Sequence, residues 1–177
     1  MLYYIHGYLS TPHSTKGTLF KEKLQAISIK YRDGKPEDLV ITDCLQRIRE
    51  SIRGDNNIVL IGSSLGGFLA AATALNNKNV KHLILLNPAL IPPSTDRKTI
   101  TDLPQSIAQD MIEPRLFFTK LSCRITIFRG IDDDVVPDEW VLSFARAQEA
   151  TVHFIKDDHR FSQSVEHIAE KISQLLM

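Results

Sequence analysis

The sequence predicts a single α/β domain, spanning residues 1–177, in which a mainly parallel sheet of six strands carries helices on both faces. Its 177 residues correspond to about one domain at roughly 150 residues per domain. Short apolar runs alternate with amphipathic stretches along the whole chain, which is typical of parallel strands joined by helical crossovers. The run at residues 58–61 is apolar without interruption. Such a run fits a strand buried on both faces, so we expect it near the centre of the sheet.

Each element follows from one of these two patterns. The short apolar runs predict strands at residues 2–5, 27–31, 58–61, 82–86, 124–128 and 152–155. The amphipathic stretches predict helices at residues 16–26, 36–53, 66–76, 138–147 and 162–176. Pro36 and Pro137 stand near the expected starts of two helices, where a missing amide proton is tolerated.

Residues 87–122 interrupt this alternation. The stretch has 36 residues, five of them proline, and is too long for an ordinary connection. We therefore expect a small cap inserted within the domain, with short helices near residues 103–111 and 114–120. Its apolar side chains are candidates for a substrate-binding wall, although side chains at this spacing are more often core. These candidates are Met111, Phe117 and Phe118, with Leu103 and Ile107.

The composition argues against several classes of protein. The chain has 21 basic residues (lysine and arginine) and 21 acidic residues (aspartate and glutamate). It therefore has no basic excess that would favour a nucleic-acid partner. No stretch has the roughly 20 apolar residues of a membrane span, and the first residues resemble no signal peptide. Cys44 and Cys123 fit neither a disulfide framework nor a zinc site. We expect a cytoplasmic protein without metal or cofactor.

The segment Gly62-Ser63-Ser64-Leu65-Gly66 has the G-x-S-x-G pattern between an apolar strand and an alanine-rich helix, the context which that pattern requires. Only Ser64 has glycines two residues before and two after it, so we expect Ser64 to be a nucleophile. The Leu65 amide would then be an oxyanion donor. The alternative is a Gly/Ser-rich turn that packs well or binds a phosphate. Neither nucleotide-binding glycine motif follows a strand here.

A serine nucleophile needs a base, and imidazole suits neutral pH. In hydrolases of this architecture the chain order is serine, acid, histidine, which admits His153, His159 and His167. His153 lies within the last predicted strand and His167 within the last predicted helix. His159 follows the last strand, at the edge where an open α/β sheet places its site. We therefore predict that His159 is the base.

The acid should follow the preceding strand, where Asp132, Asp133 and Asp134 stand together. We favour Asp133, because Val135 and Val136 can anchor the turn beneath it. Asp132 and Asp134 have the simpler interpretation of turn residues or helix caps, although either could be the acid. A buried carboxylate would fix the tautomer of the histidine and stabilise the imidazolium.

The first predicted strand ends in His6-Gly7-Tyr8, beside the expected position of Ser64. The second oxyanion donor is therefore expected to be the Tyr8 amide, with Gly7 permitting the close turn. We expect His6 to be structural, hydrogen-bonded into the loop.

These motifs resemble the α/β-hydrolase superfamily and, more narrowly, the small bacterial YqiA-like esterases. The resemblance runs almost end to end. It implies Ser64 as nucleophile, Asp133 and His159 as its partners, and hydrolysis of carboxylic esters or thioesters. The spacing Gly-x-x-Asp-x-Val-Val-Pro also favours Asp133. The residues that carry it are Tyr4 to Tyr8 with Ser10, Pro12 and Ser14, Ile61 to Gly67, Asn87-Pro88-Ala89, Gly130 with Asp133, and Asp158 to Phe161.

The predicted activity is hydrolysis of short-chain or small carboxylic esters through an acyl-enzyme, because so short a chain leaves little material for a deep tunnel. An acyl-coenzyme A thioesterase is one alternative. It would need a basic groove, for which the cap offers Arg97, Lys98, Arg115 and Lys120. A non-catalytic binding module with the same fold is the other alternative. The sequence leaves the natural substrate and the oligomeric state open.

Overall fold

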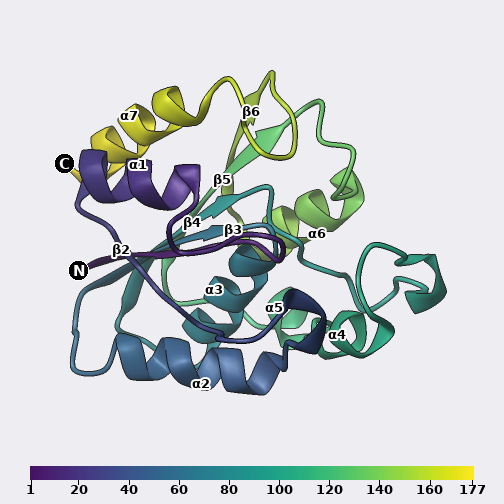
Figure 1. The fold of residues 1–177 in the computed structure, drawn as a ribbon. Coiled ribbons are helices and arrows are strands. Elements are labelled where there is room, and N and C mark those ends of the chain that lie inside the picture. Colours follow the sequence, from purple (N-terminus) through teal and green to yellow (C-terminus); the bar gives the residue numbers. More distant parts are fainter.

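The computed structural model describes the backbone of residues 1–177 and the side chains of all of them except Arg97. Within this described chain, six strands form one sheet in the order β2-β1-β3-β4-β5-β6, and every neighbouring pair is parallel (Figure 1). The predicted fold class is confirmed, and β3 lies in the interior of the sheet. The strands are β1 (Leu2–Ile5), β2 (Ile27–Ser28), β3 (Ile58–Ser63), β4 (Val80–Leu86), β5 (Arg124–Gly130) and β6 (Thr151–Ile155).

Helices cover both faces of the sheet. Helices α1 (Thr15–Leu24) and α7 (Val165–Leu176) lie together on one face, above the sheet in Figure 1. The other face carries α2 (Ile41–Ser51), α3 (Leu65–Leu75), α5 (Arg115–Phe118) and α6 (Asp138–Gln148). No helix in the described chain is long and apolar enough to cross a membrane.

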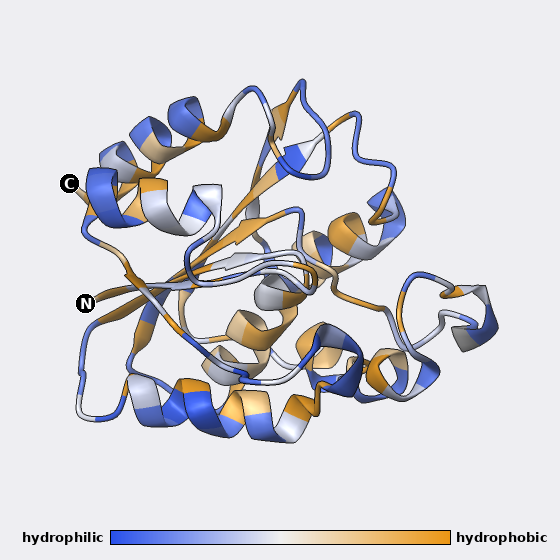
Figure 2. Ribbon diagram, in the orientation of Figure 1, coloured by the Kyte–Doolittle hydropathy of each residue, from blue (hydrophilic) through white to orange (hydrophobic). Residues whose placement is uncertain are grey.

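Two apolar clusters, one on each face, hold these layers together. Alternate side chains of β3 enter different clusters: Leu60 packs with α2 and α3, whereas Ile61 packs with α1 and α7. This double burial explains why the run at residues 58–61 is apolar without interruption. Figure 2 shows the same logic, with hydrophobic strands inside and helices whose outward faces are hydrophilic.

The helix expected at residues 36–53 is broken, and this expectation was wrong in one detail. A 3₁₀ turn, η1 (Pro36–Asp38), is followed by extended backbone at Leu39 and Val40 before α2 begins. Leu39 and Ile41 are both buried. Residues two apart lie on opposite sides of a helix but on one side of an extended strand. The extended link therefore lets both side chains reach the core.

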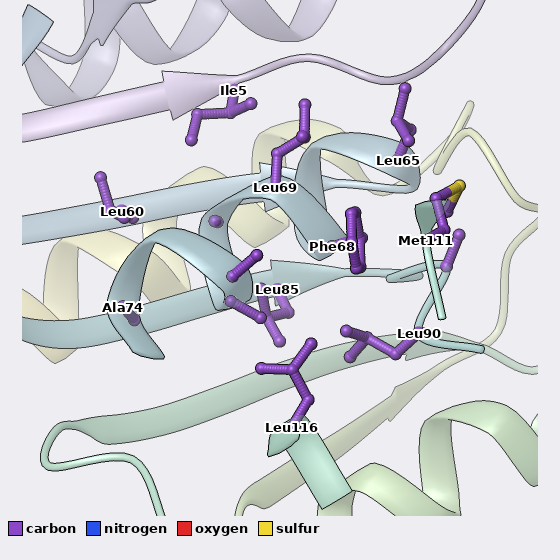
Figure 3. Packing of buried hydrophobic residues seen from close by; sticks show 14 of the residues in the cluster. Ile5, Leu60, Leu65, Phe68, Leu69, Ala74, Leu85, Leu90, Met111 and Leu116 are labelled. Atoms are coloured by element: carbon purple, nitrogen blue, oxygen red, sulfur yellow. The ribbon is translucent and has the colours of Figure 1, made fainter. Parts of the chain in front are cut away.

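The segment at residues 87–122 leaves the sheet after β4 and returns at β5. It contains a short 3₁₀ turn, η2 (Arg97–Thr99), then α4 (Gln105–Asp110) and α5. Its later half is tied to α6 by the buried side chain of Gln148, which donates to the carbonyls of Leu116 (2.7 Å) and Thr119 (2.8 Å). The Leu121 amide donates back to Gln148 Oε1 at 2.9 Å. In Figure 3, Met111 and Leu116 lie in the same apolar cluster as Phe68 of α3.

Candidate active site

Ser64 lies at the sharp turn between β3 and α3. Its backbone has φ 54° and ψ −120°, a conformation that non-glycine residues rarely adopt. The turn is held by main-chain hydrogen bonds on both sides: the Ser64 amide donates to Leu86 O (3.0 Å), and its carbonyl accepts from the amides of Gly67 (2.8 Å) and Ala89 (3.1 Å). The predicted nucleophile is thus fixed at the carboxyl edge of the sheet, as the motif indicates.

The two glycines that flank Ser64 are required by close packing. A Cβ atom on Gly62 would lie 2.4 Å from Gly66 O, and one on Gly66 would lie 2.1 Å from Ile5 O. Both distances are far below contact distance. The glycines therefore let α3 begin directly against β1 and the turn.

The predicted acid and base meet across two loops, one after β5 and the other after β6. Asp133 Oδ2 accepts a hydrogen bond from His159 Nδ1 at 2.9 Å. The Asp133 side chain is 0% exposed, whereas that of His159 is 17% exposed. The other acceptor, Asp133 Oδ1, receives the amides of Val135 (2.8 Å) and Val136 (3.0 Å). These two residues do anchor the turn, through their main chain.

Electrostatics keep Asp133 ionised. Burial by itself would raise the pKa of its carboxyl group, but the hydrogen bond from His159 and the two amides hold that pKa below its ordinary value. Asp132 is exposed, and Asp134 is exposed at the rim of the cavity described below. The other two candidates for the base lie away from Asp133. His153 stacks on Phe128 in the sheet, and His167 is exposed on α7.

Ser64 and His159 line one cavity of about 740 Å³, together with Tyr8 and Leu65. Asp133 lies behind His159, outside the lining. The cavity has an apolar part, contributed by the segment at residues 100–103, the loop before α6 and the first turn of α6. It also has a polar part, contributed by the loop after β1, the start of α1 and the loop after β6. The apolar part includes Ile100, Leu103, Val135 and Trp140, and the polar part includes Ser10, Ser14, Lys16 and Arg160.

The predicted oxyanion donors are the amides of Tyr8 and Leu65. Neither amide donates to an acceptor within the described part of the chain, and both residues line the cavity. The end of β1 runs beside the serine, since a Cβ atom on Gly7 would lie 3.3 Å from Ser64 Cβ. His6 is buried, with Nδ1 2.9 Å from Gly7 O and its ring stacked on Tyr31. Burial lowers the pKa of His6 to about 4, so the ring is neutral at pH 7, and its contact with Gly7 O is the predicted hydrogen bond into the loop.

The structure puts the predicted substrate-binding side chains away from the cavity. Met111 is buried in the core (Figure 3), Phe117 packs edge-to-face on Phe144, and Phe118 is 81% exposed. The reason is the path of the cap, whose later half folds down onto α3 and α6. Among the five candidate side chains, Leu103 lines the cavity. Ile107, like Met111, is buried in the core.

The proposed basic groove is likewise not assembled at the cavity. Arg115 pairs with Glu113 at 2.7 Å, and Lys120 pairs with Glu149 at 2.8 Å. Neither residue lines the cavity, nor does Lys98. The side chain of Arg97 lies outside the described part of the structure.

Sequence reasoning missed two buried polar residues behind the site, Asn87 and Arg129. Asn87 adopts a positive φ of 42°, and its side chain accepts the Gly130 amide (2.8 Å) and donates to His159 O (3.1 Å). It therefore joins the end of β4 to both loops that carry the predicted acid and base. The Asn87-Pro88-Ala89 motif contributes to the family resemblance, but the sequence alone assigns no function to Asn87. Arg129 could have been noticed as a charged residue that directly follows the run Ile125 to Phe128 of β5.

The parallel six-stranded sheet with helices on both faces is an α/β-hydrolase fold, and Ser64 lies at the turn after β3. Over 99% of the chain it superimposes on 87% of Est1E from Butyrivibrio proteoclasticus with bound ferulic acid (TM-score 0.80, 20% identity). It also matches 88% of mouse α/β hydrolase domain-containing protein 10 (TM-score 0.79, 20% identity, 99% of this chain). A third similar structure is the monoacylglycerol lipase of Paleococcus ferrophilus (TM-score 0.77, 14% identity, 99% of this chain and 93% of the lipase).

The chain itself belongs to an uncharacterised protein family, UPF0227, whose family model matches residues 1–176. No curated protein sequence matches it.

Proposed function

We propose that this protein is a serine esterase that hydrolyses small carboxylic esters. The observation that carries the proposal is the hydrogen bond from His159 Nδ1 to the buried carboxylate of Asp133 (2.9 Å). Because Nδ1 is engaged with Asp133, Nε2 is the ring nitrogen of His159 that remains free. His159 lines the same cavity as Ser64. Serine, acid and histidine also follow in the chain order of α/β hydrolases.

In the proposed reaction, Ser64 Oγ attacks the ester carbonyl carbon while His159 Nε2 takes the hydroxyl proton. The carbonyl oxygen becomes an oxyanion and is stabilised by the Tyr8 and Leu65 amides. The tetrahedral intermediate expels the alcohol, which receives the proton from His159, and Ser64 is left acylated. Water then attacks the acyl-enzyme with His159 again as base, and the carboxylic acid is released. Asp133 stays ionised throughout and stabilises the imidazolium.

The structural neighbours support an ester as the substrate class. Est1E holds ferulic acid, and other neighbours are an esterase of Pyrococcus furiosus and a monoacylglycerol lipase. A cavity of about 740 Å³ is within the usual range for small-molecule sites. Its mixed apolar and polar lining suits a small ester better than a long acyl chain. We expect activity to rise over the first few acyl carbons, by about 0.8 kcal/mol for each buried methylene, and then to level off.

Labelling with a fluorophosphonate tests the chemistry. An activated serine beside oxyanion donors reacts with this probe, and an ordinary serine does not. Mass spectrometry should find the adduct on Ser64, in Ser63→Ala as in the unaltered protein, and Ser64→Ala should lose it. An adduct on Ser63 would refute the assignment of the nucleophile. Absence of any adduct would favour a non-catalytic binding module.

A series of simple esters and matched coenzyme A thioesters then tests the substrate. Lys16 and Arg160 are cations that line the cavity and give the thioesterase alternative its structural support. This alternative is correct if coenzyme A thioesters are hydrolysed faster than the matched esters and the difference in rate becomes smaller as salt is added. Activity that rises steadily to long acyl chains would contradict the preference for small esters.

A further inference from the structure

Arg129, at the end of β5, has a buried guanidinium that contacts the predicted acid. Its side chain is 3% exposed. Nη1 donates to Asp133 Oδ2, which is the same oxygen that accepts from His159 Nδ1. Nη2 donates to Val136 O at 2.8 Å, and Nε donates to Asp138 Oδ1 at 2.8 Å. The guanidinium is therefore held in place from three directions.

The serine mechanism does not require this arginine. Histidine and two amides already satisfy the Asp133 carboxylate, and burying a guanidinium carries a desolvation cost that only good geometry offsets. What Arg129 adds is a positive charge on the oxygen that faces the imidazole. That charge opposes the stabilisation that Asp133 gives to a protonated His159, since a like charge within about 4–6 Å disfavours the charged form of a group.

Arg129 also reaches the main chain of the histidine loop through Asn87. Nη1 lies 3.3 Å from Asn87 Oδ1, and Asn87 Nδ2 donates to the carbonyls of His159 (3.1 Å) and Asp158 (3.3 Å). Asn87 is completely buried. One guanidinium thus contacts the side chain of the acid directly and the loop of the base through a single buried amide.

We propose that Arg129 is a positioning residue of the active site, which holds Asp133 against His159 and extends to lower pH the range in which His159 is free to act as a base. The proposal rests on the proposed esterase function. It concerns only how the acid and base are held and charged, so it applies to esters and thioesters alike.

Other charged groups surround His159, and the test leaves them unchanged. Asp157 is buried, and Asp158 lies in the same loop as His159. Both have pKa values below the ordinary range: hydrogen bonds to Asp157 outweigh the effect of its burial, and the Ser162 hydroxyl has the largest effect on Asp158. The remaining groups lie on four elements: Asp134 in the turn after β5, Asp102 in the cap, Lys16 at the start of α1 and Arg160 after His159, all lining the cavity.

Three variants separate charge from geometry: Arg129→Gln removes the charge, Arg129→Lys keeps it without the planar fork, and Asp138→Asn removes the acid that competes for it. Asp138 is 68% exposed, so its replacement leaves the core intact. The measurement is the kcat/KM–pH profile on one soluble ester. Arg129→Gln should move the midpoint of the acid limb up by about one pH unit. Arg129→Lys should lower kcat with the midpoint near that of the unaltered enzyme, and Asp138→Asn should move the midpoint down.

A purely structural arginine would give a different result. Arg129→Gln and Arg129→Lys would then lose activity alike, with no movement of the acid limb, and the proposal would be wrong. The His159 imidazole can also be titrated by NMR in the Ser64→Ala protein, with and without Arg129→Gln and Asp138→Asn. This readout needs no turnover. If no ester is hydrolysed but the His159 titration midpoint moves as expected, only the proposed function is refuted. If the His159 midpoint does not move in these variants, the proposed role of Arg129 is refuted.

Discussion

The backbone of Ser64 allows a direct measurement of the strain stored at the candidate active site. With φ 54° and ψ −120°, Ser64 occupies a region that costs a non-glycine residue about 1–3 kcal/mol. Replacement by glycine removes that cost, whereas replacement by alanine keeps it. Both variants lose Oγ and its contacts, so they differ only in the Cβ atom and in the backbone strain that the Cβ atom causes. Glycine gives back about 0.4–1 kcal/mol through the entropy of the unfolded chain.

We therefore expect Ser64→Gly to be more stable than Ser64→Ala by about 1 kcal/mol, which corresponds to about 2–4 °C in Tm for a chain of this size. Urea unfolding followed by circular dichroism would measure the difference, provided that both variants have the same m-value. Ser63 is the matched control, because it is buried beside Ser64 in the ordinary strand backbone of β3. There the glycine variant should be the less stable by about 0.5–1 kcal/mol. Equal or reversed stabilities at Ser64 would show that the turn is not strained.

Further predictions address the acid, the cap and pH. Asp133→Asn should lower kcat by about 10⁴-fold, because the asparagine holds the wrong histidine tautomer, while Asp132→Asn should have a small effect in the same assay. Met111→Ala should lower the free energy of unfolding by about 2–5 kcal/mol in urea, whereas Phe118→Ser, at a surface position, should change neither stability nor KM. Burial lowers the pKa of His82 to about 4, so the unfolded chain binds the extra proton between about pH 6.5 and 4. Stability should fall as the pH drops through that window, and urea titrations at several pH values should show a weaker fall in His82→Gln.

Local patterns in the sequence were enough to predict the parts of the fold that depend on local chemistry. Three features are determined by residues close in sequence: the apolar run of β3, the glycines around Ser64 and the loop position of His159. The choice of Asp133 among three aspartates rested partly on the two valines after it, and their amides do bind its carboxylate. Secondary structure and the edge of the sheet on which the site lies could thus be predicted from sequence.

Features that depend on contacts distant in sequence could not be predicted. The break before α2 arises because Leu39 and Ile41 must both enter the core, and no local pattern marks it. The direction of the cap depends on Gln148, which lies beyond the next strand. Arg129 and Asn87 are 42 residues apart, and only the folded sheet shows that they share one network. For this reason Met111 and Phe118 could be recognised as apolar cap residues without their direction being known.

The unequal attachment of the cap bears on how substrate range could change through evolution or engineering. Gln148 secures the later half of the insertion to α6, whereas Thr99, Thr101 and Asp102 at its front edge are exposed and line the cavity. Surface substitutions of this kind usually change stability by less than about 0.5 kcal/mol. A library of variants at these three positions would therefore reshape the rim of the cavity while the sheet and the residues around Ser64 keep their packing. Selectivity and stability are then separately adjustable in one short chain.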